Sequence, residues 1–285
     1  MSSVAVIVQY ALREALRRKV FAVVVLLTVV FLGLFWLATH FVHNELDTIT
    51  PPSDVHVDTR TFAGAFLLGL AMFATLFLGV VLAVFLTLGV VSGDAERGLL
   101  QPLVVRPIGR STLLLSRFLA AAGVCAGYVI SVYLTAVVIV GLTLDWWPAA
   151  IVSPGVELAL GVLIVIALSL LGSVVLSATA NGIAVFMLFG AGLVAGLLGT
   201  IGHALNSHQI RHASTIASWA LPFEGLYQDG LRLISRDTTG ATSFLLQLGP
   251  FGGGYVHGWT IRVWGVAYLA VVGAAALALF ARKDL

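Results

Sequence analysis

Residues 93–117 read GDAERGLLQPLVVRPIGRSTLLLSR and separate two long apolar runs of the chain. The stretch holds six charged residues, although only 10% of the 285 residues are charged and 60% are hydrophobic. Because charged side chains are costly inside a bilayer, this stretch is expected to lie in water between two membrane-spanning helices. It therefore fixes the alternation of spans and loops on either side of it.

The apolar runs around this stretch predict a multi-pass helical membrane protein. The mean hydropathy of +1.06 is far above that of soluble domains, and several runs exceed the roughly 20 residues that a helix needs to cross a bilayer. A transmembrane β-barrel would show short alternating segments instead. We expect one all-α domain over residues 1–285, with spans at residues 19–42, 61–91, 112–143, 156–179, 183–205 and 259–281.

The basic residues predict the orientation of these spans. Ten of the 15 basic residues, with only four of the 13 acids, fall before the first span, around the loop 92–111 or at the C-terminus. Cytoplasmic loops are enriched in lysine and arginine, so both termini are expected in the cytoplasm. Five of the six tryptophans fall toward the opposite ends of the spans, where an aromatic belt is expected. A tight turn at residues 180–182 is expected between the fourth and fifth spans.

Residues 1–18 predict a helix that lies in the membrane interface. Gln9, Arg13 and Arg17 recur at intervals of four, so they form one polar stripe on a largely apolar helix. The alternative is that these charges only orient the first span. A cleavable signal is disfavoured because a full-length span follows.

The second and third spans are long enough to leave the membrane. Residues 61–91 and 112–143 would form helices of about 47 Å, whereas the hydrocarbon core is about 30 Å thick. We expect both helices to project into the cytoplasm and to hold the loop 92–111 away from the lipid.

The loop 92–111 predicts a short helix with an apolar face. Asp94 and Glu96 favour a helix start, Pro102 fits only a first turn, and Pro107 ends the helix. The helix is expected over residues 99–106, outside the hydrocarbon, so its apolar face is expected to bind a protein partner. A merely solvated connector is the alternative. The apolar face consists of Leu99, Leu100, Leu103 and Val104.

The order of residues in this loop is similar to that of the cytoplasmic loop of type-2 ABC transporter permeases. The residues that carry the resemblance are Gly93, Asp94, Glu96, Arg97, Gly98, the apolar helix, Arg106, Pro107, Ile108, Arg110 and Arg117. Residues 1–18 resemble the elbow helix of that family, and FARKDL at residues 280–285 resembles its basic C-terminus. LPFEGLYQDGLRL at residues 221–233 is similar to the segment between its fifth and sixth spans.

The resemblance implies a permease subunit of an ATP-driven exporter in a bacterial plasma membrane. In that family two permease copies each dock on an ATPase subunit through this loop, giving a 2:2 complex. The coupling residues would be Gly93, Asp94, Glu96, Arg97, Gly98, Leu99, Leu100, Leu103, Val104, Arg106, Pro107 and Arg110. The chain has no G-x-x-x-x-G-K-[ST] sequence, so ATP and Mg²⁺ are expected in the partner ATPase, and this chain is expected to hold no cofactor and no catalytic residue.

The substrate is expected to be amphiphilic or apolar, such as a drug, a lipid or a peptide. Asp145 and Glu157 are expected at outer ends of spans, and no span centre carries an acid or base for a proton relay. Membrane lipids, but no nucleic acid, are expected as further partners. The residues expected along the substrate pathway are Phe73, Thr75, Phe77, Tyr128, Ser131 and Tyr133.

The remaining features suggest no enzyme and no metal centre. The seven histidines lie at or beyond outer span ends without carboxylates or cysteines to complete a ligand set, and Cys125 is expected to pack inside the third span. Residues 206–258 are expected to form short helices that cap the outer mouth. The alternative function is a membrane assembly or mechanotransmission subunit that passes ATPase motion to an extracellular partner without moving a solute.

Overall fold

The computed structural model describes residues 19–46, 59–88, 110–236 and 258–282, and this part of the chain consists of helices joined by short connections. Among the described residues, six helices are long and apolar enough to cross a membrane, and two shorter helices, α8 (His208–Ala220) and α9 (Pro222–Ile234), lie between the fifth and sixth of them. The prediction of an all-α protein with six spans is confirmed. The six long helices are α2 (Lys19–Leu46), α3 (Thr59–Thr87), α5 (Arg110–Leu144), α6 (Val152–Val175), α7 (Ala178–Ala204) and α11 (Trp259–Arg282).

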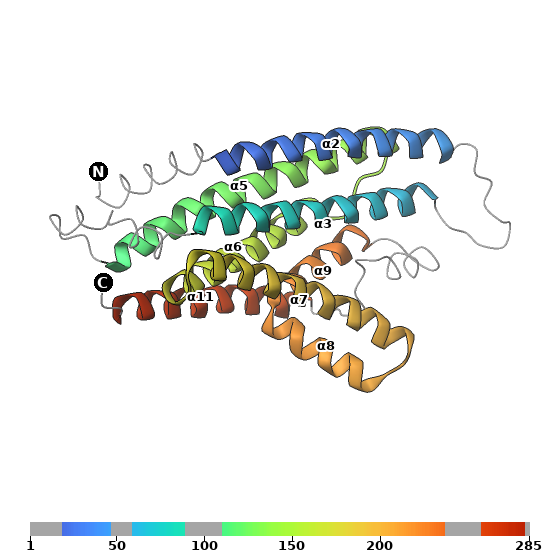
Figure 1. Cartoon of the computed structure of the whole chain (residues 1–285). Helices are drawn as coiled ribbons and strands as arrows, with labels where there is room; N and C mark the ends of the chain where they lie inside the picture. Colours follow the sequence, from blue (N-terminus) through green and yellow to red (C-terminus); the bar gives the residue numbers. More distant parts are fainter. Residues whose placement is uncertain (1–18, 47–58, 89–109, 237–257, 283–285) are drawn as a thin grey trace.

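Successive long helices run in opposite directions, so the bundle has two distinct ends (Figure 1). At one end α2 and α5 begin and α11 finishes; we call it the basic end, after Lys19, Arg110 and Arg282. At the other end α6 and α11 begin; we call it the tryptophan end, after Trp146 and Trp259. Charged residues nevertheless occur at both ends, because Arg60 of α3 and Arg262 of α11 lie near the tryptophan end.

The predicted turn between the fourth and fifth spans is wrong by a few residues. The structure ends α6 at Val175 and begins α7 at Ala178, so residues 180–182 lie in the first turns of α7. Asn181 has the composition of a turn residue, but it is fully buried and its Nδ2 donates a hydrogen bond to the Ser169 carbonyl at 2.9 Å. The hydrogen bond to Ser169 therefore explains why Asn181 lies inside α7 and not in the turn that the sequence predicted.

Both spans are longer than the hydrocarbon core is thick. With 35 residues, α5 is about 52 Å long and exceeds the hydrocarbon thickness. The described part of α3 has 29 residues and is about 44 Å long, and residues 89–91 of this predicted span lie outside the described part of the chain. The expected elbow helix (residues 1–18) and residues 92–109 of the loop lie outside the described residues.

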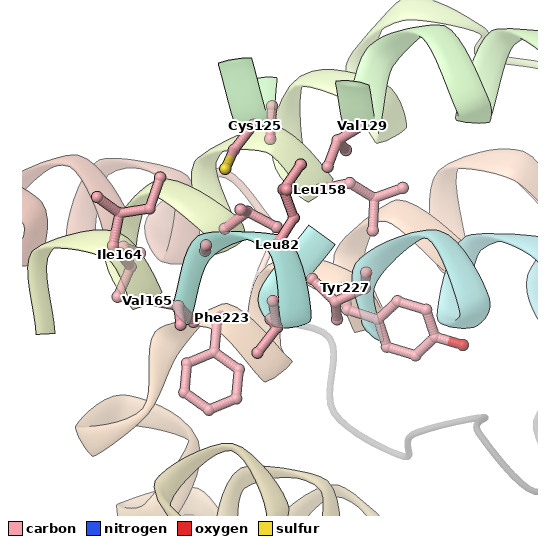
Figure 2. Close-up of a cluster of buried hydrophobic side chains, with 14 of the residues drawn as sticks. Leu82, Cys125, Val129, Leu158, Ile164, Val165, Phe223 and Tyr227 are labelled. Carbon is pink, nitrogen blue, oxygen red and sulfur yellow. The ribbon is translucent and has the colours of Figure 1, made fainter. Parts of the chain in front are cut away.

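The core is formed where α3, α5 and α6 meet (Figure 2). Leu82 of α3, Val129 of α5 and Leu158 and Ile164 of α6 are fully buried there, and Cys125 packs among them. A β-carbon on Gly79 of α3 would lie 2.7 Å from Cγ2 of Val129 and 3.0 Å from Cγ2 of Val162. Glycine at this position therefore permits the close approach of the three helices.

The helix α2 packs against this core through one face only. Its buried residues Val24, Thr28, Phe35 and Thr39 recur at helical spacing. The hydroxyl of Thr28 forms a hydrogen bond with the hydroxyl of Tyr128 on α5. Most other apolar side chains of α2 are exposed, as expected for a helix that faces lipid.

The two short helices are present in the predicted segment, but α9 enters the bundle rather than capping its end. Every residue from 222 to 230 is buried, and α9 packs along α6 and α11 (Figure 1). Phe223 lies against Gly161, about 14 Å along α6 from the tryptophan end. It also packs on Phe189 of α7, with 5.6 Å between the ring centroids. The α8–α9 hairpin thus reaches the middle of the bundle.

Replacing Gly79 with alanine tests the close packing of α3. The added methyl group overlaps the side chains of Val129 and Val162, so Gly79→Ala should lower the free energy of unfolding by about 1 to 3 kcal/mol. Thermal unfolding in detergent measures the change. Gly123→Ala is the matched control, because a β-carbon there meets nothing within 4 Å. Equal stability of the two variants would show that α3, α5 and α6 do not approach as described.

Candidate functional site

The structure tests little of the predicted coupling loop. The residues from Gly93 to Pro107 lie outside the described part of the chain. Arg110 is the first residue of α5, at the basic end, and Thr87 ends α3 at that same end. The loop therefore connects two helices at the basic end of the bundle.

The three pathway residues expected on α3 have different surroundings. Phe77 is 43% exposed and its ring lies 6.3 Å from that of Phe189 on α7. Phe73 is half-buried and contacts Tyr227 of α9 edge to face. Thr75 is fully buried and donates a hydrogen bond to the Ala71 carbonyl of its own helix. Of the three, Phe77 has the exposure expected of a pathway wall.

The three pathway residues expected on α5 also lie apart. Ser131 is exposed and donates a hydrogen bond to the Gly127 carbonyl, and Tyr128 is half-buried against α2. Tyr133 is buried, and its ring packs against Gly155 of α6, where a β-carbon would come within 2.8 Å of it. The structure does not bring the six residues together around one cavity.

Exposed apolar side chains form stripes on α3 and α7. The spacing of the α3 stripe, four, seven and eight residues, keeps it on one side of the helix, and the α7 stripe recurs at intervals of four and seven. Phe77 of the α3 stripe contacts Phe189, which is buried and lies on the opposite side of α7 from the α7 stripe. We call these stripes the α3/α7 face; it consists of Phe66, Leu70, Phe77 and Phe85 on α3 and Ile183, Met187, Val194 and Ile201 on α7.

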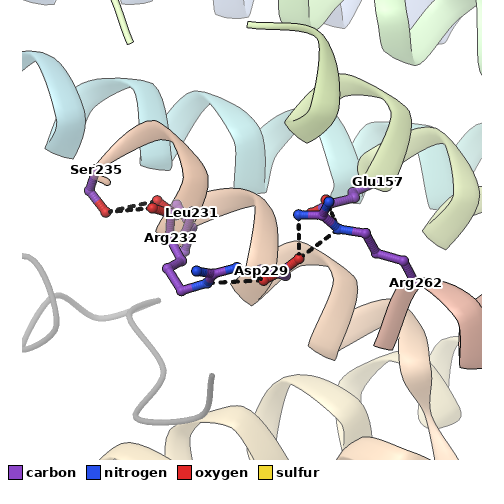
Figure 3. Close-up of polar contacts among 6 residues, drawn as sticks. All are labelled: Glu157, Asp229, Leu231, Arg232, Ser235 and Arg262. Atoms are coloured by element: carbon purple, nitrogen blue, oxygen red, sulfur yellow. Dashed lines mark hydrogen bonds and ion pairs between the residues drawn. The ribbon is translucent and has the colours of Figure 1, made fainter. Parts of the chain in front are cut away.

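Four charged side chains form an ion cluster between α6, α9 and α11 near the tryptophan end (Figure 3). Arg262 of α11 donates from Nε to Oδ2 of Asp229 at 2.9 Å, and its Nε lies 2.7 Å from Oε1 of Glu157. Arg232 donates to Oδ1 of Asp229 from Nη2 at 2.7 Å and from Nε at 3.0 Å. The ion cluster, Glu157, Asp229, Arg232 and Arg262, thus ties the hairpin to both neighbouring spans.

The ion cluster buries its acids and leaves its bases partly exposed. The side chains of Asp229 and Glu157 are 1% and 4% exposed, against 36% for Arg262 and 37% for Arg232. Two arginines lie against Asp229, so α9 can place this carboxylate inside the bundle. Asp229 accepts hydrogen bonds from both arginines, whereas Glu157 accepts none from the described residues. Asp229 is therefore the centre of the cluster, and Glu157 is held by charge attraction to Arg262.

A second acid of α9 lies deeper in the bundle. Glu224 is buried against Gly196 of α7, and its Oε1 accepts a hydrogen bond from Gln228 at 2.9 Å. Burial raises the pKa of Glu224 to about 7, although the hydrogen bond from Gln228 lowers it in part. The carboxyl of Glu224 is therefore the group of α9 whose charge changes near neutral pH.

A third polar contact joins α3, α6 and α7 near the basic end. The hydroxyls of Thr87 and Ser169 lie 2.6 Å apart, and Asn181 donates to the Ser169 carbonyl. All three side chains are fully buried. Thr87 is the last residue of α3.

The sequence reasoning missed the ion cluster because it placed Glu157 at the outer end of a span. Helix α6 in fact begins at Val152, so Glu157 lies inside it and is buried. Ionisable residues within spans usually face the bundle interior and pair with one another. Glu157 in the fourth span and Arg262 in the sixth could have been paired by that rule, whereas nothing in the local pattern placed Asp229 between them.

A comparison with known families gives one match. The model of the family described as ABC-2 family transporter protein matches residues 5–285, which include every described helix. No curated protein matches the chain.

Removing Arg262 should destabilise the bundle. Arg262→Ala leaves the buried carboxyls of Glu157 and Asp229 without their partner on α11, which should cost about 1 to 3 kcal/mol because the Arg262 side chain is itself partly exposed. Adding Glu157→Gln should recover part of the loss, because the unpaired charge is then gone. Thermal unfolding of the single and double variants measures both effects. Arg236→Ala, at an exposed position just beyond α9, is the control and should change little. A double variant less stable than Arg262→Ala would contradict the pairing.

Glu224 should make stability depend on pH. Between pH 4.5 and 7 the unfolded carboxyl ionises while the folded one retains its proton, so the free energy of unfolding should fall as the pH rises, by up to roughly 3 kcal/mol. Below pH 4.5 and above pH 7 this component is constant. Glu224→Gln should remove it, which thermal unfolding at a series of pH values detects. Parallel pH curves for the variant and the parent chain would show that Glu224 is not buried as described.

Proposed function

Because the chain belongs to the ABC-2 transporter family, we propose that it is the permease subunit of an ATP-driven exporter whose energy comes from a separate ATPase subunit. The match over residues 5–285 carries this proposal. The six apolar helices are the membrane-crossing part that such a subunit requires. ATP and Mg²⁺ would bind to the ATPase partner, because the chain lacks a phosphate-binding loop sequence.

We place the ATPase at the basic end, which would face the cytoplasm of a bacterial cell together with both termini. The clustering of Lys19, Arg110 and Arg282 at this end supports the assignment. The loop 92–111 leaves the bundle here, so its apolar helix would dock in a groove of the ATPase. Arg97, Glu96 and the other coupling residues of the loop would fix its orientation there.

The buried contact of Thr87 with Ser169 and Asn181 supports a route for motion from the ATPase into the membrane. A shift of the loop would move the end of α3, and the hydrogen bonds would carry the shift to α6 and α7. Coupling of this kind requires a contiguous physical contact between the elements that move. Hydrogen bonds between buried hydroxyl and amide groups provide it.

The α3/α7 face supports an apolar or amphiphilic substrate. The exposed side chains of its α3 stripe would form one wall of a pathway, and a second copy of the chain would supply the other wall in a 2:2 complex. Of the residues expected along this pathway, Phe77 lies on this face. The α8–α9 hairpin, fixed by the ion cluster near the tryptophan end, would close the outer exit.

Reversing the charge of Glu96 tests the proposed coupling. Glu96→Arg should place a like charge or an unpaired group at the ATPase contact, which costs about 2 to 5 kcal/mol and weakens docking by roughly 30-fold or more. The variant should insert and form dimers but lose ATPase binding and substrate export in proteoliposomes. Binding constants and transport rates measure the two effects.

The control is Glu45→Arg, which reverses an exposed acid near the end of α2 distant from the loop and should leave docking unchanged. Normal ATPase binding by Glu96→Arg would contradict the docking site. A chain that binds and stimulates the ATPase but moves no lipid, drug or peptide would favour the mechanotransmission alternative.

A further inference from the structure

The helix α9 is held on two sides by contacts of different chemistry. On one side Asp229 forms ion pairs with Arg232 and with Arg262 of α11. On the other side Glu224 lies against Gly196 of α7. Both acids are buried, yet among the described residues only Asp229 has arginines against it. Ionic contacts thus hold α9 to α11, whereas its contact with α7 is uncharged.

The contact between α7 and α9 is too close to admit a side chain on α7. A β-carbon on Gly192 would lie 2.6 Å from the ring of Phe223, and a β-carbon on Gly196 would overlap the carboxyl of Glu224. Gln228, one turn further along α9, donates to Oε1 of Glu224 at 2.9 Å. Only 4% of Glu224 is exposed, so little of it can contact water. This packing suits a protonated carboxyl, because a buried carboxylate without a cation is strongly disfavoured.

The described helices that pack on α9 place no cation against Glu224. Burial raises the pKa of Glu224 to about 7, and in the described part of the chain only the hydrogen bond from Gln228 lowers it. Tyr227 lies beside Glu224 on α9, and the ion cluster is centred on Asp229, about 7.5 Å further along this helix. Ionisation of Glu224 would therefore place an unbalanced charge between α7 and α9. The other charged or ionisable residues of these helices are Arg60 on α3, His203 on α7, His208, Arg211 and His212 on α8, and Tyr268 and Arg282 on α11.

We propose that α7 and α9 form a pH-sensitive joint, in which loss of the Glu224 proton separates α7 from α9 while the ion cluster keeps α9 on α6 and α11. Separation would expose the carboxylate to water and so remove the cost of burying it. The α7 side is the weaker of the two, because no ion pair of the described residues crosses it and because α9 packs more extensively on α6 than on α7. In the proposed permease the hairpin would close the outer exit, so the joint would open this exit as the pH rises. That consequence rests on the proposed function, whereas the separation itself does not.

The direction of the pH response follows from the two states of Glu224. Docked against α7 the carboxyl has a pKa of about 7, and exposed to water it would have its usual pKa of 4.5, a difference of about 2.5 pH units. The separated state thus binds the proton more weakly. The ratio of separated to docked molecules should rise between pH 4.5 and pH 7, by up to roughly 300-fold, and stay constant outside this window.

Distances between spin labels test the joint in the full-length chain without an ATPase. Nitroxides on Val194→Cys of α7 and Val263→Cys of α11, both exposed positions, report the separation by double electron–electron resonance at pH 5 and pH 8. Val156→Cys of α6 paired with Val263→Cys is the matched control, because the ion cluster holds both helices to α9. Cys125 is buried, and a chain with no introduced cysteine measures any labelling of it.

At pH 8 the α7–α11 pair should show a longer distance that is scarce at pH 5, and the α6–α11 pair should not change. Glu224→Gln should keep the short distance at both pH values, because its amide does not ionise. Gln228→Lys supplies a cation beside Glu224 and should do the same, so it decides the matter even if Glu224→Gln does not fold. An α7–α11 distance that is independent of pH, an equal lengthening in either variant, or a lengthening of the α6–α11 pair would overturn the proposal. None of these results would affect the proposed function, because neither ATPase nor substrate is present.

Discussion

A carboxylate stays charged inside a membrane bundle only where cations lie against it, and this constraint governs the position of α9. Asp229 is almost fully buried and accepts hydrogen bonds from Arg232 and Arg262. Without those arginines, desolvation of the carboxylate would oppose entry of a polar helix into the bundle. With them, α9 packs on α6 and α11, and its apolar side reaches the core through Phe223. The hairpin and the two spans therefore form one unit.

Polar contacts of different kinds lie near the two ends of the bundle. Near the tryptophan end the contact is ionic and partly open to water through its arginines. Near the basic end it consists of uncharged, fully buried groups, Thr87, Ser169 and Asn181. Between them the core of α3, α5 and α6 is apolar and closely packed at Gly79. In a permease of the proposed kind, helix ends at the basic end would move with the ATPase, while the ion cluster would hold α9 in place near the tryptophan end.

The sequence predicted the six spans because each is a continuous apolar run, and every predicted boundary lies within about five residues of a helix end. It could not predict features that depend on contacts between distant segments. Asn181 is a residue type common in turns, and its hydrogen bond to Ser169, on the preceding helix, cannot be read from the local sequence. The short helices were expected from the spacing of residues 223–234, but their insertion depends on Arg262, about 30 residues further along the chain. The pathway residues on α3 and α5 were chosen without knowledge of which face is buried, so Thr75 and Tyr133 lie in the core.

The central claim is that this chain passes ATPase motion from its basic end into a membrane pathway shared by two copies. A structure of the chain bound to its cognate ATPase, determined by single-particle cryo-electron microscopy, tests it most directly. The account predicts two copies of each subunit, ATPase density on the loop between α3 and α5, and the two α3/α7 faces turned toward each other. ATPase density at the tryptophan end, or one isolated copy of the chain per ATPase, would contradict it.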